Sequence, residues 1–235
     1  MKVQRLHPWR VPAVEAKAIQ ERMRGMLTLR GVLRGVKLIA GADISYPRFS
    51  PRAVAGVVVL SWPGMQVVET RTVAGAMAFP YVPGLLSFRE GPLLLRAFEL
   101  LRTEPDLIFF DGQGVAHPRG FGLASHMGLL LERPSLGCAK SRLFGRSTEP
   151  GTEAGSRTAI FDPSGLQIGI TLRTRTGVLP LFISPGHRIG MEAAADWALR
   201  ACRGYRIPEP VRQAHLLVNR RRRELSGSKD NESSS

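Results

Sequence analysis

The stretch LIFFDG at residues 107–112 decides the fold that we expect for this chain. Its unbroken apolar run predicts a strand buried on both faces, which is typical of the centre of a sheet with parallel strands. The acid and the glycine that end the run predict a loop at the tip of that strand. Asp111 is therefore expected at one edge of the sheet.

The segments that follow this stretch predict strand–helix–strand alternation. A helix is expected over residues 120–131 and a buried strand over residues 135–139. Since a strand that returns to the same sheet through a helix runs parallel to the first, we expect a parallel pair covered by a helix. Further elements are expected later in the chain: strands over residues 158–174 and 178–184, and helices over residues 189–202 and 210–224.

The segments that precede the stretch predict an antiparallel three-strand meander. Its strands are rich in β-branched residues and are separated by Pro, Gly and Ser. They lie at residues 36–44, 53–62 and 66–73. Helices are expected over residues 12–30 and 87–102, and the second begins near Ser87, which stands in capping-box spacing with Glu90. The predicted fold class is therefore α/β, with a mixed sheet that joins the meander to parallel strands.

The composition is that of one globular domain with a polar tail. With 235 residues, of which 43% are hydrophobic, the chain is within the size of a single core and has the apolar side chains to form one. Residues 226–235 contain only Ser, Gly, Lys, Asp, Asn and Glu, which bury little apolar area. We expect a single domain over residues 1–225 and a disordered tail over residues 226–235.

The charge balance favours a polyanionic partner. The formal net charge is +14, and most of the 33 basic residues are arginine. Guanidinium groups bind phosphate oxygens in a bidentate geometry, so nucleic acid is the partner that such a surface suits. An arginine-rich proteome would produce the same bias, and charge alone therefore leaves the partner open.

The cysteines and the hydropathy pattern bear on the compartment. Cys138 and Cys202 are too few and too far apart for a disulfide scaffold or a zinc knuckle, which indicates a reducing interior. No apolar run is long enough to span a membrane, and residues 1–12 lack the apolar stretch of a signal peptide. We expect a cytoplasmic protein that has no membrane partner and acts as a monomer.

Three acids at the ends of predicted elements are candidates for a metal site. Asp43 and Asp111 lie in apolar strand contexts, and Glu90 lies one turn inside the helix that follows the meander. A carboxylate in an apolar strand is costly unless it is paired, hydrogen-bonded or coordinating a cation. Hard oxygen ligands favour Mg²⁺, with Mn²⁺ as a substitute. Each acid alone would be read as a cap or a turn residue. Together they follow the order of acids in ribonuclease H-like nucleases, whose mixed sheet has helices on both faces.

A longer stretch resembles a known family. Residues 111–119 and 122–128, DGQGVAHPR and GLASHMG, are similar to the signature of endonuclease V. Other similar blocks occur in the order and spacing of that family, at residues 41–43, 81–90, 137–140, 184–188 and 208–215. The resemblance covers residues 35–218 and implies a ribonuclease H-like nuclease.

The resemblance implies roles for the catalytic candidates. Asp43, Glu90 and Asp111 match the metal-site acids of the family, and Lys140 matches the lysine that contacts the scissile phosphate. His215 stands where the family has His or Asp near the metal. Without the resemblance, Lys140 and His215 would be read as ordinary surface residues.

The resemblance also implies a wedge loop and a base pocket. Pro80-Tyr81-Val82-Pro83 resembles the loop whose aromatic ring fills the gap left when a base leaves the stack. In the pocket, glycines would let backbone groups approach hypoxanthine, which differs from adenine at the six position and at N1. Leucines would form apolar walls, and a histidine would lie close by. These candidates are Gly84, Leu86, Gly112, Gly114, His117, Leu123, Gly137 and Leu143.

These expectations define one leading function and two alternatives. The leading function is a metal-dependent hydrolase that recognises deaminated purines in DNA by base flipping. As the family implies, it would cut the second phosphodiester bond 3′ to the lesion, leave a 5′-phosphate and so initiate DNA repair. One alternative changes the substrate to inosine-containing RNA or to other substrates of ribonuclease H-like nucleases. The other is a lesion-binding protein without catalysis, although converging acids would repel phosphate unless a cation neutralised them.

Overall fold

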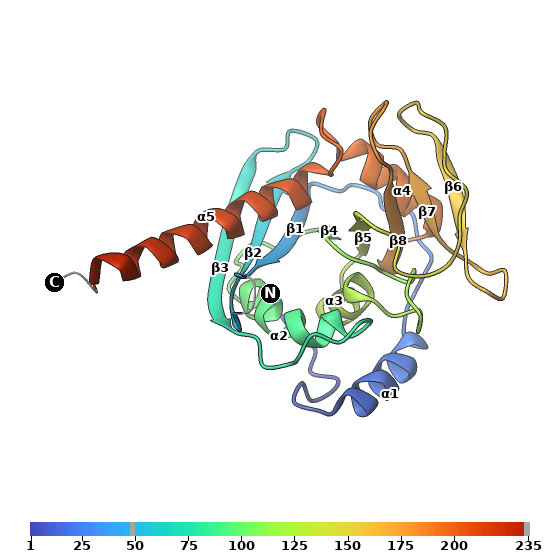
Figure 1. The fold of residues 1–235 in the computed structure, drawn as a ribbon. Coiled ribbons are helices and arrows are strands. Elements are labelled where there is room, and N and C mark those ends of the chain that lie inside the picture. The colour runs from blue at the N-terminus through green and yellow to red at the C-terminus, as the bar shows by residue number, and fades with distance from the viewer. Residues whose placement is uncertain (48–49, 233–235) are drawn as a thin grey trace.

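A computed structural model of the chain describes residues 1–47 and 50–232, which form one mixed sheet flanked by helices (Figure 1). The strands are β1 (Leu38–Ser45), β2 (Arg52–Ser61), β3 (Val67–Ala76), β4 (Leu107–Phe110), β5 (Ser135–Ala139), β6 (Arg157–Phe161), β7 (Gln167–Leu172) and β8 (Leu181–His187). The helices are α1 (Ala13–Arg24), α2 (Leu86–Glu99), α3 (Leu123–Leu131), α4 (Met191–Arg200) and α5 (Glu209–Glu232).

The strand pairing confirms the predicted mixture of parallel and antiparallel neighbours. The order across the sheet is β3-β2-β1-β4-β5-β8-β7-β6. β1, β2 and β3 form the antiparallel meander, whereas β4 runs parallel to both β1 and β5. β4 is buried along its whole length, as its unbroken apolar run predicts. The carboxyl ends of β1 and β4 therefore meet at one edge of the sheet.

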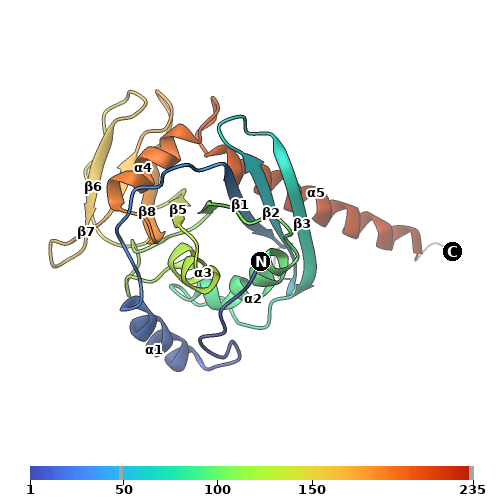
Figure 2. The same cartoon turned by 180° about the vertical axis from the view of Figure 1, so that it is seen from behind.

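Helices cover both faces of the sheet (Figures 1 and 2). α1, α2 and α3 contribute to the core on one face, and α4 and α5 to the core on the other. Because successive side chains of a strand point to opposite faces, Phe110 packs in the first core and Phe109 in the second. β4 is thus anchored by one aromatic ring on each side.

One predicted strand is a hairpin in the structure. The sequence predicts a single strand over residues 158–174, whereas β6 and β7 lie there in antiparallel pairing. Oδ1 of Asp162 holds the turn by accepting hydrogen bonds from the backbone amides of Ser164 and Leu166. Gly165 has a φ of +86° in this turn, which only glycine adopts without strain. The Asp-Pro-Ser-Gly sequence at residues 162–165 is the signal that separates the two strands.

The start of α2 also differs from the prediction. The helix begins at Leu86 after an N-cap at Leu85, and no side chain caps it, so the predicted capping box of Ser87 and Glu90 is wrong. Oγ of Ser87 instead lies 2.9 Å from Nδ1 of His126. The Ser87 hydroxyl therefore bonds to His126 of α3 and does not cap the helix, although its spacing in the sequence favours a cap.

The ends of α1 and α5 lie elsewhere than expected. α1 ends at Arg24, six residues before the predicted end. Gly25 is its C-cap, and the low helix propensity of glycine favours an end there. α5 continues to Glu232 and extends away from the sheet (Figure 1), so the backbone of residues 226–232 is helical where composition predicts a disordered tail. The backbone hydrogen bonds of a helix join residues four apart, so this segment can be helical without packing against the rest of the protein. The prediction from composition considered only the lack of apolar side chains to bury. Residues 233–235 of that prediction lie outside the described residues.

Over the described ranges, no helix is both long and apolar enough to cross a membrane.

Candidate active site

The carboxyl ends of β1 and β4 bring two of the predicted acids together. In the parallel pairing of these strands, Ala42 is the partner of Phe110, and the next residues along the chain are Asp43 and Asp111. Glu90 reaches the same place from the first turns of α2, which packs against β1. The structure thus gathers the three acids that the sequence predicts as a group.

Burial and repulsion between carboxylates raise the pKa of Glu90 and of Asp43. Glu90 is only 7% exposed, and burial, followed by the charges of Asp43 and Asp111, raises its pKa to about 8. Burial, and then the charge of Asp111, also raises the pKa of Asp43. Among the residues that the structure describes, the Glu90 carboxylate has no hydrogen-bond or ion-pair partner. Ionising Glu90 is therefore unfavourable unless a cation arrives.

His215 and Lys140 contact the two acids at the strand ends. Nδ1 of His215 lies 2.8 Å from Oδ2 of Asp43, and Nζ of Lys140 forms an ion pair with Oδ2 of Asp111. Lys140 follows β5, the parallel neighbour of β4, and His215 lies on α5. The structure places both residues beside the acids, where the sequence predicts them.

The tautomer of His215 follows from its neighbours. Nδ2 of Asn219 donates to the backbone oxygen of His215 at 2.9 Å, which identifies this atom as the amide nitrogen. The same nitrogen lies 3.0 Å from Nε2 of His215, so Nε2 accepts and the ring proton is on Nδ1. His215 therefore donates to Asp43. Ser45 extends the chain by donating to Oδ1 of Asn219 at 2.7 Å, and Nε of Arg222 donates to Ser45 at 2.9 Å.

The donor chemistry of the site fits a divalent cation. Three carboxylates lie within electrostatic range of one another, and the most buried of them has no partner among the described residues. A hard cation would offset both the repulsion and the cost of burial. Asp43, Glu90 and Asp111 are the residues that could hold it. Among the side chains described in residues 1–47 and 50–226, no three His, Cys, Asp or Glu residues have the closer spacing of a preformed metal site. Asp43 and Asp111 direct oxygens toward His215 and Lys140 instead.

A cavity of about 380 Å³ adjoins Asp111 and Lys140, a volume within the usual range of small-ligand sites. Its wall includes most of the predicted base-pocket residues, namely Gly84, Leu86, Gly112, His117, Leu123 and Leu143. The predicted wedge contributes Tyr81, Val82 and Pro83, while Pro80 stands just outside the wall. The Tyr81 side chain is 68% exposed. A cavity of small-ligand size and an exposed aromatic side chain therefore lie beside Asp111.

Gly114 and Gly137 do not belong to the cavity wall, and their place in the base pocket stays a prediction. A Cβ on Gly137 would lie 2.3 Å from the backbone oxygen of Gly112, and one on Gly114 would lie 2.1 Å from that of Pro185. Both glycines allow neighbouring backbone segments to pack closely, and this close packing explains why glycine stands there.

The carbonyl of Gly84 receives three side-chain donors. Nε2 of Gln20, Nε2 of His117 and Nη2 of Arg119 lie 3.1, 2.9 and 2.7 Å from its oxygen. Nε of Arg119 also donates to Oε1 of Gln20 at 2.6 Å. Burial, and then the charge of Arg119, lowers the pKa of His117 to about 4, so this ring is neutral near pH 7. These donors hold the end of the loop that carries Tyr81.

Sequence reasoning missed several residues around the site, among them Gln20, Gln113, Arg119 and Asn219. Asn219 stands four residues after His215 on α5, a spacing that places both side chains on one helix face. That spacing is a signal that the sequence contains. Gln20 comes from α1, and nothing in its local sequence indicates that it reaches the cavity.

Comparison with known proteins places these features in one family. Residues 21–216 match the sequence profile of the endonuclease V family. An endonuclease V from Dehalococcoides mccartyi is 50% identical over 218 residues, which cover 93% of this chain and 97% of the relative. The crystal structure of endonuclease V from Streptomyces avermitilis is similar with a TM-score of 0.87 at 39% identity, and the match covers 96% of this chain and 100% of that chain.

A further solved structure contains nucleic acid. Endonuclease V from Ciona intestinalis, in complex with a DNA containing an inosine followed by a ribo-adenosine, is similar with a TM-score of 0.82 at 28% identity. The match covers 90% of this chain and 97% of that chain. The matched segment spans every acid of the site as well as Lys140 and His215. From the site geometry together with these comparisons, we conclude that the chain is a hydrolytic nuclease that belongs to the endonuclease V family.

Proposed function

We propose that this protein is a metal-dependent endonuclease that binds a deaminated purine, chiefly hypoxanthine, in DNA and hydrolyses the second phosphodiester bond on its 3′ side. The observation that carries the proposal is the gathering of Asp43, Glu90 and Asp111 beside a cavity that can hold a base. The binding of inosine-containing DNA by the Ciona intestinalis protein supports the choice of lesion. The enzyme acts as a monomer in the cytoplasm, with residues 1–225 as its nuclease domain.

The acids hold the cation, and two cationic or donor groups assist them. Asp43, Glu90 and Asp111 are the residues that would hold Mg²⁺, for which Mn²⁺ could substitute. A cation held there would supply Lewis-acid stabilisation of the charge that develops on the scissile phosphate. Lys140 leaves its ion pair with Asp111 and places a second positive charge at that phosphate. His215 donates to Asp43 and holds this carboxylate in position.

The cavity receives the extruded base. Tyr81 is exposed and fills the gap in the base stack, while the prolines at residues 80 and 83 restrict the loop that carries it. Leu86, Leu123 and Leu143 supply apolar walls for the ring faces. The hydrogen bonds to the Gly84 carbonyl hold the wedge loop in one conformation before DNA binds. Less conformational entropy is then lost on binding.

Product mapping tests this function. A duplex with a single inosine and a labelled strand is incubated with the protein in Mg²⁺, in Mn²⁺ and in EDTA. We expect one nick at the second linkage 3′ to the inosine, with 3′-hydroxyl and 5′-phosphate ends, and no nick in EDTA. Asp43→Ala and Asp111→Ala should abolish nicking, whereas Asp196→Ala, which alters an exposed acid on α4, should retain it. Nicking that persists in the first two variants would refute the assigned metal site.

RNA is the second candidate substrate. The DNA bound by the Ciona intestinalis protein has a ribonucleotide directly after the inosine, which favours a site that tolerates a 2′-hydroxyl. Competition between DNA and RNA oligonucleotides of the same sequence, each with one inosine, separates the two substrates. Tight binding without cleavage at every Mg²⁺ or Mn²⁺ concentration would instead support a lesion-binding protein.

A further inference from the structure

Helix α5 runs alongside β1 and continues past the acids. Nδ1 of His215 lies 2.8 Å from Oδ2 of Asp43 in β1. Four residues later, Oδ1 of Asn219 accepts from Ser45, the last residue of that strand. The helix and the strand therefore point the same way, and α5 passes beyond the sheet edge at which the acids lie. Figure 1 shows the red end of α5 projecting from the sheet. The residues after Asn219 are thus placed beside any substrate that lies across this edge.

The projecting part of α5 begins with four consecutive arginines. Residues 220–226 have the sequence RRRRELS, so one glutamate accompanies four positive charges. The side chains of Arg220 and Arg221 are 70% and 47% exposed, and Arg223 is exposed as well. Like charges three or four residues apart on a helix repel each other. A polyanion that lies along this segment would relieve the repulsion.

Two of the four arginines are engaged within the protein. Arg222 is half-buried, and its Nε donates to Ser45 at 2.9 Å, so it belongs to the chain of bonds that holds the site histidine. Arg221 forms an ion pair with Glu224 at 3.0 Å. The same glutamate lies 3.9 Å from Arg220, and an exposed pair at that distance contributes little. The charge of Glu224 therefore offsets Arg221 more than Arg220.

The other two arginines lie on the outer side of the helix next to His215. Successive residues are about 100° apart around a helix, so Arg223 is about 80° and Arg220 about 140° from His215 in one direction. Arg221 is about 120° away in the other direction. Nε of Arg223 donates to the backbone oxygen of Asn219 at 3.3 Å, so this side chain folds back along the helix toward His215. Arg220 and Arg223 thus form a positive surface that adjoins the active site.

We propose that Arg220 and Arg223 bind phosphates of the DNA duplex on one flank of the lesion, so that α5 provides a sequence-independent contact beside the active site. The inference rests on the proposed function, because it takes the DNA to lie across the sheet edge that carries the acids. Guanidinium groups bind phosphate oxygens in a bidentate geometry. From His215 to Arg223 the helix rises about 12 Å, which is the length of about four base pairs. The contact therefore falls on the duplex about four base pairs from the cleaved linkage.

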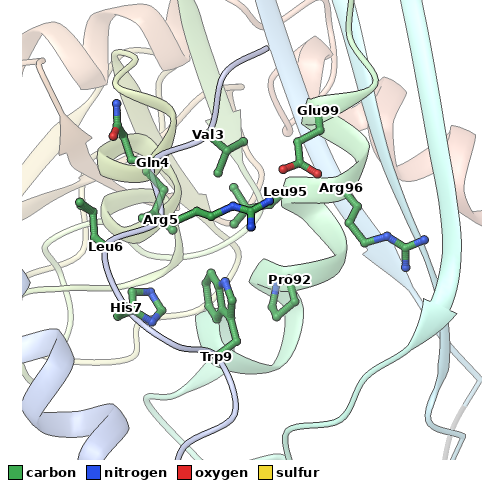
Figure 3. Close-up of a pocket in the computed structure, with 11 residues that line it drawn as sticks. Val3, Gln4, Arg5, Leu6, His7, Trp9, Pro92, Leu95, Arg96 and Glu99 are labelled. Atoms are coloured by element: carbon green, nitrogen blue, oxygen red, sulfur yellow. The ribbon is translucent and has the colours of Figure 1, made fainter.

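Another pair of exposed arginines provides a matched control. Arg5 and Arg96 lie at a second cavity, between the N-terminal segment and α2, together with Glu99 (Figure 3). This cavity shares no lining residue with the base cavity. Replacing both of its arginines lowers the net charge by as much as replacing Arg220 and Arg223. A difference between the two double variants therefore reflects the position of the charges and not their total.

The salt dependence of DNA binding tests the proposal without cleavage. The affinity of the full chain for a lesion-free duplex is measured by fluorescence anisotropy in EDTA over a range of salt concentrations. Each phosphate contact contributes about 0.9 to the slope of log Kd against log salt, so Arg220→Ala/Arg223→Ala should lower this slope by about two. Arg5→Ala/Arg96→Ala and Arg221→Ala should keep the wild-type slope. Alanine has a high helix propensity, so α5 is retained in the variants, and circular dichroism checks this.

The length of the DNA flanks tests where the contact lies. Duplexes with a single inosine are made with long flanks on both sides, or with one or the other flank shortened. On the long duplex in Mg²⁺, we expect Arg220→Ala/Arg223→Ala to raise KM at unchanged kcat. The variant should match the wild type once one of the two flanks is shorter than about four base pairs. Shortening the opposite flank should leave the difference in place.

Several outcomes would overturn the proposal. One is a wild-type slope in Arg220→Ala/Arg223→Ala, and another is an equal decrease in this variant and in Arg5→Ala/Arg96→Ala. A lower kcat at unchanged KM would show that the two arginines act on the catalytic groups and not on the flank. An unchanged slope together with lost binding of poly-glutamate would identify an acidic protein as the partner. If the wild type cut no inosine duplex, the proposed function would fail, and the salt dependence in EDTA would still decide whether α5 binds DNA.

Discussion

We expect Glu90→Gln to make the metal-free protein more stable than the wild type at pH 8.5. Burial, together with the charges of Asp43 and Asp111, raises the pKa of Glu90 from 4.5 to about 8. Between these values the folded protein keeps a proton on Glu90 that the unfolded chain has lost. The contribution of Glu90 to stability is therefore present below pH 4.5 and is lost as pH rises through about 8, so the free energy of unfolding falls across this window.

The size of the effect follows from the shift in pKa. One pKa unit corresponds to about 1.4 kcal/mol, so ionising Glu90 inside the folded protein costs on the order of 5 kcal/mol at alkaline pH. Glutamine has nearly the same shape and carries no charge, so the variant lacks this cost. The two proteins should therefore be nearly alike at pH 5 and should diverge as the pH rises.

Urea denaturation in EDTA at pH 5 and pH 8.5 measures the difference. Glu99→Gln alters an exposed glutamate at the end of the same helix and should show no pH-dependent gain. Adding Mg²⁺ at pH 8.5 should stabilise the wild type much more than Glu90→Gln, because the cation binds the ionised carboxylate. If the variant were no more stable than the wild type at pH 8.5, the reasoning that three carboxylates repel one another here would be refuted.

Three further predictions concern residues around the acids. Asn219→Leu removes the donor that fixes the tautomer of His215 and should slow nicking about fivefold at unchanged substrate affinity, a loss of roughly 1 kcal/mol; steady-state kinetics with an unchanged kcat would contradict it. Gly137→Ala should destabilise the fold by about 1–3 kcal/mol in urea denaturation, because the new Cβ would lie 2.3 Å from the backbone oxygen of Gly112. If the variant were as stable as the wild type, the loop at residues 112–114 would be able to move away from the new side chain. The pKa of His117 is lowered to about 4 in the folded protein, so between pH 6.5 and about 4 only the unfolded chain binds a proton at this residue. The stability that is present above pH 6.5 should therefore be lost as the pH falls to about 4. His117→Gln should reduce that acid loss, which is on the order of 3 kcal/mol, and denaturation midpoints measured from pH 7 to pH 4 check this.

The amino-acid sequence by itself determined the central strand, the meander and the place of each acid along the chain. An apolar run such as residues 107–110 has to be buried whatever surrounds it, and β-branched segments between turn residues favour strands. Parallel strands present their carboxyl ends at one edge, so Asp43 and Asp111 could be predicted to meet once β1 and β4 were expected as neighbours. The base-pocket residues were predicted from the resemblance to endonuclease V, and most of them, but not Gly114 and Gly137, line the cavity.

Only the tertiary structure decided which partner each polar side chain takes. Ser87 stands in a spacing that locally favours a helix cap, yet its hydroxyl is bound by His126 from another helix. Gln20 reaches the carbonyl of Gly84 across 64 residues of sequence. Gly137 allows the backbone of Gly112 to pack closely against it. These outcomes depend on distances between segments that meet only when the chain has folded. Each polar group forms its hydrogen bond with the partner that packing brings within range.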